Sequence, residues 1–208
     1  WTKWIVLLRN PVDRLYSHYQ KWAARHVQTW HVPQRQTPSF EAWLAHDLHM
    51  LRNATGVWGA VMRFLYQRES NDSHSTESNT TGVSSLEEAW KTYTHVHPMH
   101  EFGLGRGLYA IQLQHWFDAM DATGKPRSDL LVIQSEEMRQ NRDQVYRRVL
   151  RHLGLPYSPP NATNVHVGSY ATPMRNETRK LLEALYRPFN DKLTKMLANH
   201  TLEWKGWN

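Results

Sequence analysis

Arg9 and Ser17 are the residues whose types and spacing point most directly to chemistry. Both side chains suit phosphate, because a guanidinium offers a planar fork of N–H donors and a hydroxyl adds one more donor at short range. Between them lie Asn10 and Pro11, a pair typical of a helix start, since Asn caps helices and Pro suits the first helical position. Helix N-termini attract anions, so this spacing predicts an anion-binding site.

Two predicted elements position these residues. Residues 4–8 (WIVLL) form a short apolar run that predicts a strand buried on both faces. Over 11–27, apolar residues at helical spacing predict a helix with one packed face: Val12, Leu15, Tyr16, Tyr19, Trp22, Ala23 and Val27. Arg9 then lies at the carboxyl end of the strand, where open α/β sheets bind ligands. The alternative is that Arg9 pairs with Asp13 across the turn and that Ser17 is a solvated helix residue.

Further along the chain, the pattern predicts five more elements that bear on the site. Ser39 caps a helix whose apolar side is Phe40, Trp43, Leu44 and Leu48. A second amphipathic helix carries Tyr109, Leu113, Trp116, Phe117 and Met120. Residues 130–134 (LLVIQ) predict a second buried strand, and the helix after it is expected to end at Gly154. A long helix over 177–197 faces inward with Leu182, Leu185, Tyr186, Phe189, Leu193 and Leu197, and Pro188 predicts a kink in it.

The run from Arg9 to Tyr19 (RNPVDRLYSHY) resembles the RxPxxRxxSxY signature of sulfotransferases that use 3′-phosphoadenosine 5′-phosphosulfate (PAPS), especially the Golgi and bacterial carbohydrate enzymes. The resemblance implies that Arg9 and Ser17 hold the 3′-phosphate of this co-substrate, within a strand–helix unit over 3–27. It also implies an α/β fold with a P-loop-NTPase-like parallel sheet flanked by helices. It does not imply a catalytic metal.

Three later segments resemble the same family: Gly107 to Trp116, the run LLVIQSEE over 130–137, and the tail from Glu177 to Trp204. The likeness covers nearly all of 3–204 apart from a polar stretch at 69–85, which we interpret as a mobile insertion. In the family, a loop before the last helix wraps the nucleotide. Its counterparts here are Gly168, Ser169 and Tyr170, which lack the family's basic residues, although Gly168 would let backbone N–H groups approach a phosphate.

The family's P-loop-like segment, which holds the 5′-phosphosulfate and precedes the catalytic base, has no counterpart in this sequence. Because the first residue also lies almost inside a core strand, we interpret residues 1–208 as a partial sulfotransferase domain, incomplete at its N-terminus, and assign it no catalytic residue. We expect these residues to be inactive by themselves.

Composition limits the classes of site. The chain has 208 residues, 40% of them hydrophobic, which suits a single domain with a real core. It has no Cys, which excludes disulfides and thiolate metal sites. A net charge of +6 suits a nucleotide, a polyanionic glycan or a nucleic acid. Six N-x-S/T sequons favour a glycosylated lumenal protein, although chance also produces them: Asn53, Asn71, Asn79, Asn161, Asn176 and Asn199.

Two other motifs have competing interpretations. His95, His97 and His100 fall within six residues, but Pro98 disrupts their spacing and no carboxylate ligand pattern accompanies them, so we do not predict a metal site. The alternating glycines over 103–107 follow a loop instead of a strand, which argues against a dinucleotide fingerprint. Between them, Arg106 is either a ligand for an anionic acceptor or nucleotide, or a solvated basic residue.

The function that the resemblance implies is transfer of a sulfuryl group from PAPS to a hydroxyl or amino group of an anionic glycan acceptor. The complete protein would then lie in the Golgi lumen as a type II membrane protein, touching the membrane only through an N-terminal anchor outside this sequence. One alternative is a non-catalytic module that binds a polyanion or a nucleotide. The other, a nucleic-acid-binding domain, is the weakest, because the excess of positive charge is modest and no recognised motif accompanies it. We predict no nucleic-acid partner.

Overall fold

The computed structural model of this chain describes residues 2–29, 31–53, 103–159 and 173–198, together with 204, 206 and 207. They belong to two compact units. Unit 1 comprises Trp1–Asn10, Tyr109–Pro173 and Phe189–Asn208, and unit 2 comprises Pro11–Leu108 and Met174–Pro188. The insertion at 69–85, the three clustered histidines and the predicted loop residues Gly168, Ser169 and Tyr170 lie outside the described residues.

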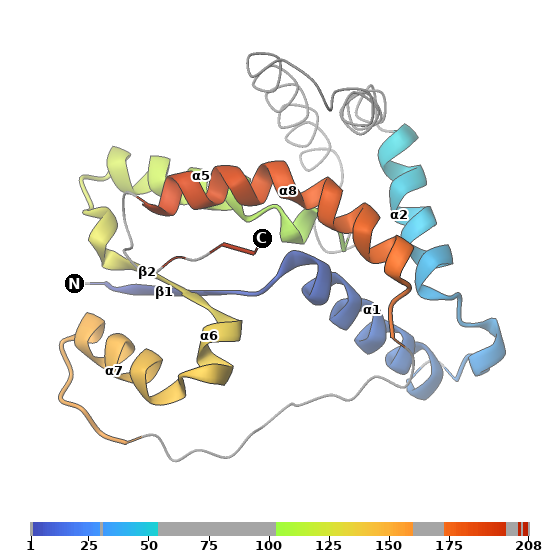
Figure 1. Cartoon of the computed structure of the whole chain (residues 1–208), viewed down its shortest axis with the longest axis horizontal. Coiled ribbons are helices and arrows are strands. Elements are labelled where there is room, and N and C mark those ends of the chain that lie inside the picture. The colour runs from blue at the N-terminus through green and yellow to red at the C-terminus, as the bar shows by residue number, and fades with distance from the viewer. Residues whose placement is uncertain are drawn as a thin grey trace. The chain divides into compact units, whose positions relative to one another are not determined.

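Unit 1 is built on two parallel strands, β1 (Trp4–Leu8) and β2 (Leu130–Gln134), which lie side by side (Figure 1). In their register, Trp4 is opposite Leu130 and Leu8 is opposite Gln134. The described helical elements of this unit are α5 (Tyr109–Ala122), the 3-10 turn η3 (Arg127–Asp129), α6 (Ser135–Gln140), α7 (Arg142–Leu153) and the part of α8 (Asn176–Ala198) that begins at Phe189. Parallel strands flanked by helices are the arrangement that the sequence predicted.

The core of unit 1 lies on one face of β1. Its buried members come from both strands, α5 and α8: Leu8, Tyr109, Ala110, Leu113, Phe117, Met120, Leu130, Val132, Leu193 and Leu197. Ile5 and Leu7 point the other way and are 41% and 53% exposed. The prediction that β1 is buried on both faces was therefore wrong for the described part of the chain. Side chains alternate across a strand, and here only the face carrying Leu8 is covered.

Most helix predictions in unit 1 are confirmed. The inward residues of α5 are buried except Trp116, which is 45% exposed at the margin of the stripe and meets Trp4 edge-on at 6.1 Å between ring centroids. Trp116 belongs to the predicted apolar stripe but is only partly covered, because a residue at the edge of such a stripe packs on one side only. Gly154 ends α7 in the left-handed conformation, with φ of 70°.

The described part of unit 2 contains α1 (Pro11–Gln28), the 3-10 turns η1 (Gln34–Gln36) and η2 (Gly105–Gly107), α2 (Phe40–Asn53) and α8 as far as Pro188. α1 buries Pro11, Val12, Leu15, Tyr16, Ser17 and Tyr19, close to the predicted face. The predicted cap of α2 is confirmed, since the Ala42 N–H donates to Ser39 Oγ at 3.2 Å. Tyr16 and Phe40 pack edge to face at 5.0 Å between ring centroids, joining α1 to α2.

Candidate functional site

The turn after β1 is fixed through its backbone. The Tyr109 hydroxyl donates to the carbonyl oxygen of Arg9 at 3.0 Å, and the Asn10 N–H donates to Glu136 Oε1 at 2.9 Å. Tyr109 begins α5, and Glu136 lies in α6 directly after β2. Because parallel strands end at the same edge of a sheet, both partners come from elements near the carboxyl end of β1. The half-buried Arg9 therefore extends from an anchored backbone.

Glu136 also holds the end of the chain. Its Oε2 accepts a hydrogen bond from Trp207 Nε1 at 3.2 Å, and Gln134 Nε2 donates to the Gly206 carbonyl oxygen at 3.0 Å. Trp207 in turn meets Tyr109 at 5.7 Å between ring centroids. The anion that binds the Asn10 N–H is thus the carboxylate of Glu136, a group of the protein itself. From the sequence, Glu136 was recognised only as part of a family-like run, although its position just after β2 could have signalled this role.

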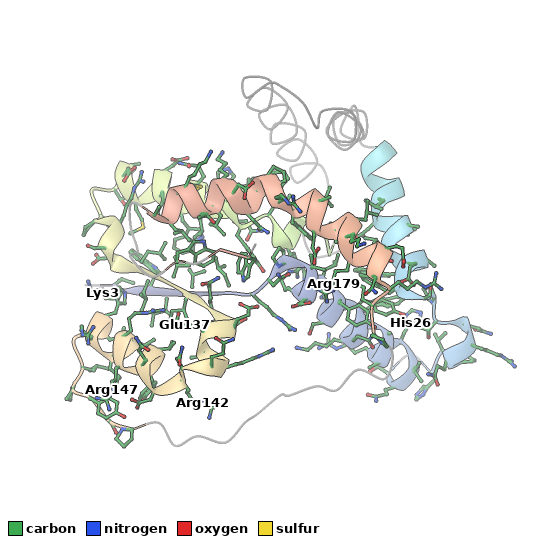
Figure 2. All side chains as sticks on the ribbon, in the orientation of Figure 1. Lys3, His26, Glu137, Arg142, Arg147 and Arg179 are labelled. Atoms are coloured by element: carbon green, nitrogen blue, oxygen red, sulfur yellow. The ribbon has the colours of Figure 1, made fainter. Side chains whose placement is uncertain are left out.

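Ser17 lies on the buried face of α1 in unit 2. Its exposure is only 9%, so the interpretation of Ser17 as a solvated helix residue is wrong. Arg179 of α8, labelled in Figure 2, donates a hydrogen bond from Nη2 to Asp13 Oδ1 at 2.8 Å, so the carboxylate one turn before Ser17 has a cationic partner within its own unit. Arg9 and Ser17 belong to different units. Their joint use in one site stays a prediction of the motif.

The glycines over 103–107 allow close packing. A Cβ atom on Gly107 would lie 2.8 Å from Tyr186 and 2.9 Å from Pro11, and one on Gly103 would lie 2.5 Å from Trp43. Contacts this short would force neighbouring side chains to shift, so glycine allows the closest packing at both positions. Packing thus accounts for two of the three alternating glycines, Gly103 and Gly107, in agreement with the argument against a dinucleotide fingerprint.

Polar contacts also hold this glycine segment. Arg14 Nη2 donates to the carbonyl oxygen of Gly103, and the Tyr186 hydroxyl donates to that of Leu104 at 2.9 Å. The Leu104 N–H donates to Asp47 Oδ2 at 3.3 Å. These contacts fix the turn that carries Arg106, η2, which packs against α1.

Asp47 is the most perturbed acid in this region. It is only 3% exposed, and burial raises its pKa to about 6, although hydrogen bonds from the backbone of Leu104 and Gly103 act in the opposite direction. A carboxyl that is partly protonated near neutral pH is expected where desolvation exceeds the stabilisation of the charge.

The described residues contain neither a candidate metal site nor a membrane-spanning helix. No group of three or more His, Asp or Glu side chains that could hold a metal ion lies among them. Nor is any described helix long and apolar enough to cross a membrane.

Residues 1–192 match the family model for the sulfotransferase domain. The chain belongs to the sulfotransferase family. Family membership confirms the predicted P-loop-like α/β fold class, which the described residues represent with a two-stranded parallel sheet among a larger number of helices.

Similar proteins carry the name carbohydrate sulfotransferase 15. The human protein is 24% identical over 212 residues, covering 97% of this chain and 31% of the human protein. The mouse protein is 23% identical over 214 residues, with 98% and 31% coverage. A protein of Nototodarus sloanii is 32% identical over 100 residues, covering 43% of this chain and 60% of its own length. The chain therefore spans about a third of the length of its mammalian relatives.

Proposed function

We propose that this chain is the 3′-phosphate-binding part of a sulfotransferase that moves a sulfuryl group from PAPS to a hydroxyl or amino group of a glycan. Family membership supports the reaction class, and the names of the relatives support a carbohydrate acceptor. The observation that carries the proposal is the burial of Ser17 on the helix that follows Arg9.

Arg9 and Ser17 are the residues we propose for the 3′-phosphate. The backbone of Arg9 is held by Tyr109, which limits the conformational freedom that binding would otherwise remove. Ser17 has little access to bulk water, and an anion in such a place is less screened than one on the surface. A guanidinium and a hydroxyl together then distinguish a nucleotide with a 3′-phosphate from one without it.

Sulfuryl transfer needs positioning, cations near the leaving oxygens and a base for the acceptor group. The proposal assigns only positioning to this chain, which would hold the nucleotide by the 3′-phosphate on its ribose. The base and the residues that hold the 5′-phosphosulfate are proposed to lie in other parts of the complete protein. Gly168, Ser169 and Tyr170 stay predicted as further nucleotide contacts, through the Gly168 backbone above all.

The acceptor and the compartment are also part of the proposal. A basic chain suits an anionic glycan, and the sequons suit a lumenal protein, which together favour the Golgi lumen and a type II anchor in the complete protein. No metal is required by this chemistry, because the cations that neutralise the leaving oxygens can be side chains.

The experiment is a transfer assay with the full-length protein. PAPS carrying radioactive sulfur is incubated with a panel of desulfated and sulfated glycans, and the label that becomes bound to glycan is counted. The proposal predicts label transfer that falls strongly in Ser17→Ala. If label is not transferred to any glycan although 3′-phosphoadenosine 5′-phosphate (PAP) still binds, the alternative of a non-catalytic binding module replaces the enzyme.

A further inference from the structure

One face of α1 carries a row of basic residues that the proposed nucleotide site does not use. Arg14, His18, Lys21 and Arg25 recur at intervals of four, three and four residues. Arg106 joins them from η2, which packs against α1 in the same unit. We call these five residues the α1 basic face.

The geometry of a helix makes this row continuous. At 100° per residue, the four α1 residues fall within about 60° of the circumference, and the 1.5 Å rise spreads them over about 16 Å. Lys21 and Arg25 are exposed, whereas Arg14, His18 and Arg106 are half-buried. Ser17 lies about 40° from Lys21 around the same helix. The row is therefore a line of positive charge that passes beside the serine proposed for the nucleotide.

The charges on this face repel one another. Burial lowers the pKa of His18 first, and Arg106, Arg14, Lys21 and Arg25 lower it further by electrostatic repulsion. These four cations thus act together on one imidazole. Their mutual repulsion would be relieved by a partner that brings several negative charges along the same line.

Aromatic rings lie along one side of the face. His18 meets Trp43 at 6.0 Å between ring centroids, and Trp22 meets Trp43 at 6.2 Å. Both tryptophans are half-buried, so part of each indole is open to solvent. An indole offers an apolar surface on which the C–H face of a sugar ring can pack. The α1 basic face, bordered by solvent-exposed parts of two indoles, therefore suits a linear ligand in which flat apolar faces alternate with anionic groups.

We propose that the α1 basic face binds a linear anionic glycan through its sulfate and carboxylate groups. Arginine suits both groups, because its planar fork matches two oxygens at once. A single-stranded nucleic acid shares part of this chemistry, but membership of the sulfotransferase family and relatives named as carbohydrate sulfotransferases favour the glycan. That this glycan is the acceptor rests on the proposed function, whereas the binding surface is tested without it.

The test uses Lys21→Ala/Arg25→Ala in the full-length protein, because both side chains are exposed and their loss leaves the packed face of α1 intact. The matched control is Lys180→Ala/Arg187→Ala, which removes one lysine and one arginine from exposed positions of α8 in the same unit. Binding to size-defined heparin and chondroitin sulfate oligosaccharides is measured by calorimetry at several salt concentrations. PAP and a single-stranded oligonucleotide serve as the other ligands.

The proposal predicts roughly tenfold weaker glycan binding for the α1 variant at low salt and a smaller dependence on salt. It predicts little change for the control variant and unchanged affinity for PAP. Equal glycan affinity in the two variants would overturn it, and so would tighter binding of the oligonucleotide than of either glycan. Loss of PAP binding alone would also overturn it, by assigning the face to the nucleotide. Failure of the proposed function would instead appear as equal affinity of the wild type for PAP and AMP, whatever the glycan result.

Discussion

Asp47 offers a prediction whose size follows from the structure. Its carboxyl is 3% exposed beneath the glycine segment, and its folded pKa is about 6 against an ordinary value of 3.8. A raised folded pKa means that the folded protein holds the proton more tightly than the unfolded chain. The resulting stabilisation is fully present below about pH 4 and is lost as pH rises through about 6. The two pKa values correspond to a change of about 3 kcal/mol in the free energy of unfolding.

Asp47→Asn removes this titration while keeping an amide oxygen that can accept the Leu104 N–H. The measurement is urea unfolding, followed by tryptophan fluorescence, in steps from about pH 4 to about pH 7. The wild-type stability minus the variant stability should fall by about 2 kcal/mol across this range, because part of the full change lies below pH 4. Asp191→Asn, at an exposed position of α8, controls for the loss of one negative charge.

A difference that stays constant with pH would refute this reasoning. It would mean that Asp47 ionises in the folded protein as easily as in the unfolded chain, so that Arg14 and the backbone N–H groups balance the cost of burial. A difference that rises with pH would refute it more strongly, because the ionised carboxylate would then stabilise the fold.

Three further predictions concern the same elements. Gly107→Ala should lower the free energy of unfolding by about 1–3 kcal/mol, because the new methyl group meets Tyr186 and Pro11; an unchanged denaturation midpoint would contradict this packing. Glu136→Ala should lower the free energy of unfolding by about 1–3 kcal/mol, because the Asn10 N–H and Trp207 Nε1 lose their acceptor. Glu137→Ala, in contrast, removes the partner of the Arg148 guanidinium and should leave the tryptophan fluorescence of Trp207 unchanged. NMR titration should give His18 a pKa below the ordinary histidine value, and heparin oligosaccharide should raise it, since bound anions offset the cations that lower it; a pKa that does not respond to the glycan would count against the α1 basic face.

Local patterns were enough to predict most of the elements. The capping residue Ser39, the apolar stripe of α8 and the glycine at the end of α7 each depend on neighbours within a few residues, and all three are confirmed. The buried face of α1 follows from helical spacing in the same way. Even the parallel pairing of β1 with β2 could be expected, because each strand is followed by a helix.

Contacts between distant segments were not predicted. Asp47 and Leu104 are 57 residues apart, and Glu136 is 126 residues from Asn10, so no local pattern links them. The exposure of Leu7 depends on which face of the sheet is covered, which the composition of the strand does not reveal. Burial of Ser17 likewise follows from packing, since a serine in a helix is more often on the polar face.

The central claim is that Arg9 and Ser17 recognise a 3′-phosphate. Calorimetric titration of the full-length protein with PAP and with AMP tests it most directly, because the two ligands differ in that phosphate alone. The wild type should bind PAP at least tenfold more tightly than AMP, since a charge-assisted contact contributes roughly 1.5–3 kcal/mol. Arg9→Ala and Ser17→Ala should each reduce this preference without changing the affinity for AMP. Equal affinity of the wild type for both nucleotides, or a preference that survives both substitutions, would contradict the account.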